Sequence, residues 1–172
     1  PVLIWFHGGG FVAGSANEYD GSVLAEQGDV VVVLVNSRLG PFGFFDWSYF
    51  GADYEGSASN GIRDQILALR WVRENIEDYG GDPGNVTIFG QSSGASSVLA
   101  LLAAPAADGL FHKAISCSGT AVYRPSEDQT EKLARRLSIQ QDDLLEEVLK
   151  MSSQEILELK LGGAFSVDGA VI

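Results

Sequence analysis

A glycine-flanked serine, placed between a short apolar segment and a run of small residues, constrains this 172-residue chain more than any other stretch. Residues 86–89 are β-branched and aromatic, which predicts a buried strand. The sequence Gly-Gln-Ser-Ser-Gly follows at 90–94, and residues 95–102 then have the composition of a buried helix. The pattern predicts a strand, a sharp turn and a helix, with Ser92 at the tip in a strained backbone conformation.

The two glycines of this motif have a steric role in that arrangement. A side chain at Gly90 or Gly94 would collide where the strand and the helix pass each other. The first turn of the helix directs its unpaired N–H groups at whatever Ser92 attacks. We therefore predict that Gly90, Gln91 and Gly94 shape the site around the serine.

A glycine-rich loop follows the first apolar segment of the chain. Residues 2–6 are continuously apolar and predict a strand buried on both faces. His7 and three successive glycines, Gly8 to Gly10, come next. Three glycines leave the backbone free to present its N–H groups to an anion, and a plain flexible turn is the alternative interpretation.

The remaining pattern of the first 120 residues is that of an α/β protein. Residues 30–35 predict another central strand, and a short helical piece at 22–27 connects it to the first strand, which implies parallel pairing. A helix with one apolar face is predicted to start at Asn60, which can cap it, and to be stopped by Gly80-Gly81. A further strand with its turn is predicted at 113–119. The apolar positions of that helix are Ile62, Ile66, Leu69, Val72 and Ile76. Residues 46–59 predict a long aromatic loop that either lines an apolar pocket or covers the core.

After residue 120 the sequence pattern predicts mainly helices. Ser126-x-x-Gln129 and Ser152-x-x-Glu155 both match the capping box, which predicts the start of a helix at each. Modest apolar stripes follow these starts. We interpret residues 121–165 as a helical excursion above the sheet, with its many acidic residues on solvated helix faces.

Composition argues against several classes of protein and partner. The formal net charge of −12 argues against a nucleic-acid or anionic-membrane partner, and no apolar run is long enough to span a bilayer. The single cysteine, Cys117, excludes an internal disulfide framework and favours a reducing, cytoplasmic compartment. The chain opens on Pro1 rather than Met, so secretion of the full protein stays open, as does its oligomeric state.

Together, the serine motif and the glycine loop predict acyl-transfer chemistry. Ser92 Oγ attacks an acyl carbon and carries the acyl group as an ester. The backbone N–H groups of Gly9, Gly10 and Ser93 bind the oxyanion that develops, and losing one such donor costs about 2.7–4 kcal/mol of transition-state stabilisation. We expect this chemistry to need neither a cofactor nor a metal.

A general base for Ser92 is harder to find in the sequence. His7 precedes the serine and abuts the glycine loop, where we expect it to pack or to hydrogen-bond and hold the shape of the loop. His112 follows the serine by only one helix, with no acid-bearing strand between them. Hydrolases with this serine motif have the chain order serine, then acid, then histidine. We therefore predict that the acid and the histidine lie beyond Ile172.

The chain resembles the type-B carboxylesterase family, which includes bacterial para-nitrobenzyl esterases, cholinesterases and fungal lipases. The resemblance rests on PVLIWFHGGGFVAG, VVVLVNSRLGPFGF, NGIRDQILALRWVRENIEDYGGDPGNVTIFGQSSGA and LFHKAISCSG. It implies an α/β-hydrolase fold with a mostly parallel central sheet and flanking helices, incomplete at both ends. Residues 1–172 are then expected to be a fragment of one domain, with the core strands and the nucleophile elbow in 1–120 and the helical excursion in 121–165.

The resemblance also implies roles for individual residues. Ser92 falls on the family's nucleophile, and Gly9, Gly10 and Ser93 fall on its oxyanion-hole donors. The implied substrate is a small-molecule carboxylic ester. The family's acid and histidine have no counterpart here, although residues 167–169 are similar to the Val-Asp-Gly segment that precedes the acid, so the chain resembles part of a protein about three times longer.

Three positions depart from the family pattern. Gln91 stands where the family usually has Glu, which removes a negative charge beside the serine and predicts a weaker pull on the imidazolium and an altered rate. Ser93 replaces Ala, with little effect because its role is a backbone N–H, and Ser37 replaces Tyr. Arg38 and Asp64 match charged family positions and are expected to form a buried structural pair.

Two alternatives to an active esterase remain. Adhesion proteins of this family use the same fold as a non-catalytic binding module, but they typically lose the serine that this chain keeps. The isolated chain is the second alternative: without the strands that carry acid and base it is expected to be inactive and poorly stable, because a truncated sheet with open edges aggregates. A fluorophosphonate probe distinguishes an enzyme from a binding module.

Overall fold

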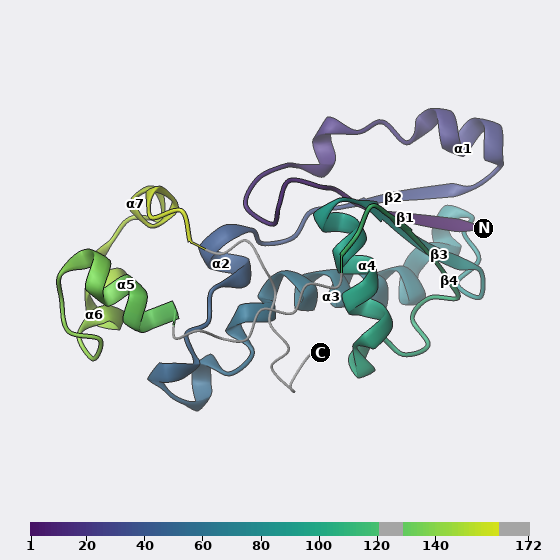
Figure 1. Cartoon of the computed structure of the whole chain (residues 1–172). Helices are drawn as coiled ribbons and strands as arrows, with labels where there is room; N and C mark the ends of the chain where they lie inside the picture. The colour runs from purple at the N-terminus through teal and green to yellow at the C-terminus, as the bar shows by residue number, and fades with distance from the viewer. Residues whose placement is uncertain (121–128, 162–172) are drawn as a thin grey trace.

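Four parallel strands form the centre of the molecule (Figure 1). The computed structural model describes residues 1–120 and 129–161. The strands are β1 Val2–Phe6, β2 Val31–Val35, β3 Val86–Gln91 and β4 Lys113–Cys117. They lie in the order β2–β1–β3–β4, with Phe6 of β1 opposite Val35 on one side and Gly90 on the other. The predicted strands and their parallel pairing are confirmed.

Two of the strands are less covered than the sequence predicts. β2 lies at one edge of the described sheet rather than at its centre, and most of its side chains are only half-buried. β1 is central, but only Val2, Ile4 and Phe6 are fully covered. Alternate side chains of a strand point to opposite faces, and the helices of the described residues cover one face more fully than the other. The prediction of burial on both faces is therefore wrong.

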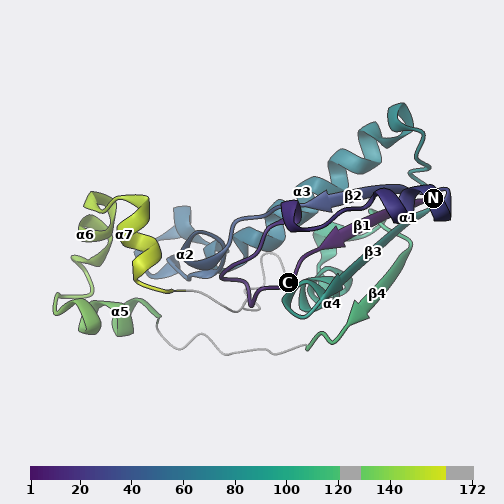
Figure 2. The same ribbon diagram turned by 90° about the horizontal axis from the view of Figure 1, so that it is seen from above.

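Helices cover the two faces of the sheet unequally. α1 (Ser22–Gly28) lies over one face, whereas α3 (Asn60–Asn75) and α4 (Ser93–Ala103) lie on the other (Figure 1, Figure 2). α2 (Gly40–Phe44) connects β2 to the segment before α3. The helix predicted at 22–27 and the helix predicted between Asn60 and Gly80 are confirmed, the second continuing from α3 into a 3₁₀ turn at Ile76–Tyr79. Within residues 1–120 and 129–161, no helix has the length and apolar character needed to cross a membrane.

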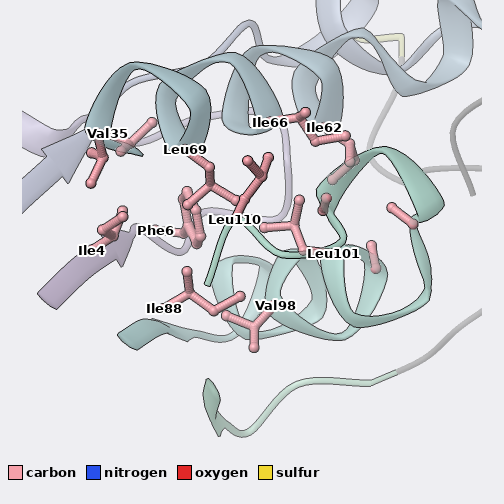
Figure 3. Packing of buried hydrophobic residues seen from close by; sticks show 14 of the residues in the cluster. Ile4, Phe6, Val35, Ile62, Ile66, Leu69, Ile88, Val98, Leu101 and Leu110 are labelled. Carbon is pink, nitrogen blue, oxygen red and sulfur yellow. The ribbon is translucent and has the colours of Figure 1, made fainter. Parts of the chain in front are cut away.

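The main core lies between the sheet and the helices α3 and α4 (Figure 3). All five apolar positions predicted for the long helix are buried. They belong to one cluster with Ile4 and Ile88 of the sheet and with Val98 and Leu101 of α4. α4 itself is buried along most of its length, as its small residues predict. This core holds the end of β3, where Ser92 lies.

A second apolar cluster lies apart from the sheet (Figure 1). It contains side chains of three short helices, α5 (Gln129–Leu137), α6 (Leu144–Lys150) and α7 (Ser153–Glu158). Leu133 and Leu144 are fully buried in it. These helices lie beside α2 rather than above the sheet, because their apolar side chains pack against the segment that follows α2.

One of the two predicted capping boxes can be seen in the structure. Ser152 N–H donates to Glu155 Oε2 at 2.7 Å, and Glu155 N–H donates to Ser152 Oγ at 3.3 Å, so this box is confirmed. The other, at Ser126, lies outside the described residues.

The segment 46–59 is more regular than the predicted loop. It forms three 3₁₀ turns, Ser48–Phe50, Ala52–Tyr54 and Ser57–Ser59. The Trp47 ring lies 4.4 Å from the Phe45 ring and 6.2 Å from the Phe50 ring, centroid to centroid. These rings cover the second cluster, and Trp47 also borders an open pocket of about 320 Å³ beside α6. The aromatic side chains of this segment therefore both cover an apolar cluster and line a pocket.

The second cluster is predicted to unfold independently of the sheet. Leu144→Ala removes apolar contacts among α5, α6 and α7, which costs about 2–5 kcal/mol. Hydrogen exchange of the full-length protein should accelerate in these helices and stay unchanged in β1 and β3. Leu149→Ala, on the same helix but 72% exposed, is the control and should change neither. Equal acceleration in β1 and β3 would show that the two clusters unfold as one unit.

Candidate active site

Ser92 lies in the turn between the carboxyl end of β3 and the amino end of α4. Its φ of 56° and ψ of −122° are rare for a residue other than glycine, and such a conformation costs about 1–3 kcal/mol. Ser92 N–H donates to the Cys117 carbonyl at 3.0 Å, and the Ser92 carbonyl accepts from Ser96 N–H at 3.0 Å. These two bonds hold the strained turn between β4 and the first turn of α4.

The two glycines that flank Ser92 lie where backbone segments touch. A Cβ on Gly94 would lie 2.0 Å from the carbonyl oxygen of Phe6. A Cβ on Gly90 would lie 2.5 Å from the carbonyl group of Gly94. Neither separation is possible without moving backbone, so a side chain at either position would force β1, β3 and α4 apart.

The glycine loop continues from the end of β1 and turns back sharply. Gly9, Gly10 and Phe11 have φ values of 115°, 64° and 63°. The N–H groups of Val12 and Ala13 both donate to the Gly9 carbonyl, at 3.2 and 3.1 Å, which closes the turn. A Cβ on Gly9 would lie 2.0 Å from the Ala13 carbonyl oxygen, so this turn requires glycine there.

Free backbone donors of the loop and of α4 are available at this end of the sheet. Gly8 lies beside the serine, since a Cβ on Gly8 would lie 3.4 Å from Ser92 Cβ. Among the described residues, the N–H groups of Gly9, Gly10 and Ser93 donate to no other backbone group. Ser93 is the first residue of α4, where N–H groups have no partner within the helix. Donors of this kind suit an anion that forms at the serine.

Gln91 brings an uncharged amide next to the serine. It is the exposed last residue of β3, and its Oε1 lies 2.8 Å from where a Cβ on Gly8 would be. The amide therefore lies beside the glycine loop as well as beside Ser92 in the chain. A carboxylate at this position would place a negative charge at the same point.

The ring of each histidine forms a hydrogen bond with a backbone group. His7 is buried, and its Nδ1 lies 2.7 Å from the Gly8 carbonyl oxygen, which requires a proton on Nδ1 because a carbonyl can only accept. The expectation that His7 holds the loop is confirmed. His112 Nδ1 accepts from Val86 N–H at 3.1 Å. Val86 begins β3 and Ser92 follows its end, so His112 lies about 20 Å from the serine at about 3.3 Å per residue.

Arg38 and Asp64 tie the segment after β2 to α3. The guanidinium donates to both carboxylate oxygens, at 2.8 and 2.9 Å, and Arg38 N–H donates to the same carboxylate at 2.9 Å. These side-chain hydrogen bonds raise the pKa of Arg38. The two side chains are 50% and 25% exposed, so the expectation of a buried pair is wrong.

Sequence reasoning missed Gln65 on the buried face of α3. This side chain is only 5% exposed, and its Nε2 donates to Ser97 Oγ of α4 at 3.1 Å. The sequence does contain a pattern that reveals it: Gln65 occupies an apolar helical position, three residues after Ile62 and four before Leu69. It lines a small cavity together with Ser93.

Known proteins are similar to this chain in both sequence and fold. A sequence model of the carboxylesterase family matches residues 1–166. The chain is 47% identical to the para-nitrobenzyl esterase of Bacillus subtilis (strain 168) over 162 residues, which cover 92% of this chain and 33% of that protein. It is 50% identical to a medium-chain fatty acyl-CoA hydrolase precursor of Anas platyrhynchos over 138 residues, covering 80% of this chain and 24% of that protein.

Solved structures agree. A carboxylesterase of Geobacillus stearothermophilus matches with a TM-score of 0.91 and 42% identity, covering 99% of this chain and 38% of that one. The juvenile hormone esterase of Manduca sexta, with OTFP covalently attached, matches with a TM-score of 0.82 and 28% identity, covering 98% and 35%. The predicted α/β-hydrolase fold is confirmed. The chain spans between a quarter and a third of the length of the curated relatives it matches. With the family match over residues 1–166 and identities of this size, the chain belongs to the carboxylesterase family.

Proposed function

We propose that the protein is a carboxylic ester hydrolase that works through an acyl-enzyme on Ser92. The observation that carries the proposal is the strained position of Ser92 at the start of α4 and beside Gly8 of the glycine loop. Membership of the carboxylesterase family supports the same chemistry. Gly90, Gln91 and Gly94 shape the turn that presents the serine.

In the proposed reaction, Ser92 Oγ attacks the acyl carbon of an ester while its proton passes to a general base. The tetrahedral intermediate collapses, the alcohol leaves with that proton, and the acyl group stays on Ser92 as an ester. Water, deprotonated by the same base, attacks the acyl-enzyme and releases the carboxylic acid. The sum is one ester and one water converted to one acid and one alcohol, with no cofactor in any step.

The N–H groups of Gly9, Gly10 and Ser93 are proposed to bind the oxyanion of each tetrahedral intermediate. Two features support the assignment: these donors are free among the described residues, and the glycine loop packs directly against the turn of Ser92. Backbone donors are held in place before the reaction, so they stabilise the developing charge without reorganising.

The general base and its acid are proposed to come from outside residues 1–172. His7 Nδ1 is bonded to a carbonyl of the glycine loop, and His112 lies at the opposite end of β3. The relatives are three to four times longer than the matched segment, which leaves ample chain for both groups.

The proposed substrate is a small-molecule carboxylic ester. One relative is named for para-nitrobenzyl esters and another for medium-chain fatty acyl-CoA, so acyl groups on different leaving groups are handled among the relatives. The net charge of −12 disfavours nucleic acid as a partner. We also propose that residues 1–172 belong to one α/β-hydrolase domain, in which 1–120 carry the site and 121–165 form the helical excursion.

Fluorophosphonate labelling tests the nucleophile. The full-length protein should be modified at Ser92, as located by mass spectrometry of the labelled peptide, because the probe needs an activated serine. Ser92→Ala should abolish labelling and lower kcat by about 10⁴-fold or more. Ser48→Ala, at an exposed serine of a 3₁₀ turn, is the control and should be labelled normally. An unlabelled wild-type protein would favour the binding module over the enzyme.

Gln91→Glu is predicted to move the pH–rate profile. A carboxylate beside Ser92 stabilises the protonated form of the catalytic imidazole, so the pKa of that imidazole rises. The acid limb of kcat/KM should then shift to higher pH by about one unit. Gln91→Met, which is neutral and of similar size, should leave the limb in place. Superimposable pH–rate profiles of Gln91→Glu and wild type would contradict this prediction.

A further inference from the structure

A small cavity lies between α3, α4 and the start of the glycine loop. About 10 Å³ is available in it to the centre of a water molecule, which is close to the minimum for one water. The polar residues that line it are His7, Ser37, Gln65, Ser93 and Ser97. The cavity therefore borders both segments to which oxyanion donors are assigned.

Gln65 contributes an unpaired buried atom to this cavity. Its Nε2 donates to Ser97 Oγ at 3.1 Å, whereas its Oε1 is buried without a hydrogen-bond partner among the described residues. Exchanging the two ends of the amide does not help, because the nitrogen would then be the unpaired atom. Leaving a buried amide atom unpaired is unfavourable, so a partner inside the cavity is expected.

We propose that this cavity binds one ordered water, and that Gln65, through this water and through Ser97, is a positioning residue for the oxyanion donors. The water donates one proton to Gln65 Oε1 and has its second proton and its lone pairs free for the neighbouring hydroxyls. Cavities that stay dry are apolar, whereas this one has several polar side chains around a single-water volume. The catalytic part of this inference rests on the proposed function, and the water site itself does not.

The proposed water site links α3 to the first turn of α4, the helix that begins directly after Ser92. Ser93 and Ser97 lie four residues apart on α4 and therefore share one helix face, which here borders the cavity. Ser93 also carries a proposed oxyanion donor on its backbone. A small displacement of this turn would move that donor relative to Ser92, and catalysis is sensitive to such shifts.

A high-resolution crystal structure of the full-length protein tests the water site. We expect electron density for a water at about 2.7–3.2 Å from the Gln65 side-chain oxygen and from at least one more polar atom of the cavity. A cavity without density, at a resolution where other buried waters are clear, overturns the proposal. This outcome does not depend on the reactivity of Ser92, so it is separable from a failure of the esterase assignment.

Gln65→Met tests the positioning role, since it keeps the volume and removes the amide. We expect kcat to fall about tenfold while KM stays within about twofold, and the affinity for a trifluoromethyl ketone inhibitor to fall in parallel with kcat/KM. Leu69→Met, on the same buried helix face but outside the cavity lining, is the control. Ser97→Ala should change kcat in the same direction and serves if Gln65→Met does not fold. Folded variants with wild-type kcat and inhibitor affinity overturn the positioning role.

Discussion

The contact of Gly94 with the carbonyl oxygen of Phe6 is the constraint on which the rest of this site depends. With no side chain at Gly94 or Gly90, α4 can approach the end of β1 at backbone distance. Because β1 leads directly into the glycine loop, the same contact brings Gly8 beside Ser92. One steric condition thus places the proposed nucleophile beside the glycine loop that carries two of the proposed oxyanion donors, although Gly9 and Gly10 are more than 80 residues from Ser92 in the chain.

The strain at Ser92 is held by the surrounding scaffold. The turn is hydrogen-bonded to the Cys117 carbonyl of β4 and to Ser96 of α4, and α4 is buried against the main core. His7 holds the glycine loop through the Gly8 carbonyl, and Gln65 links α3 to α4 through Ser97. Polar groups near the serine therefore serve mainly to hold backbone segments in place, which is what the proposed oxyanion site of backbone donors needs.

Features with a local sequence pattern were predictable from the sequence. The Gly-x-Ser-x-Gly motif, the three glycines after β1 and the apolar spacing of α3 all specify conformation over a few residues, and each element is found where it is expected. The edge position of β2, the exposure of Arg38 and the packing of α5–α7 beside α2 depend on strand order and on distant partners, which no local pattern encodes. The apolar spacing of α3 marks Gln65 as a buried position, but its hydrogen bond to Ser97 joins two helices and has no local pattern.

A crystal structure of the full-length protein after reaction with a fluorophosphonate would show the proposed nucleophile and the proposed oxyanion donors in one complex. We expect a covalent bond from Ser92 Oγ to phosphorus, with the phosphonyl oxygen at about 2.7–3.1 Å from the backbone nitrogens of Gly9, Gly10 and Ser93. Phosphorus on another residue, or a phosphonyl oxygen directed away from these three nitrogens, would contradict it.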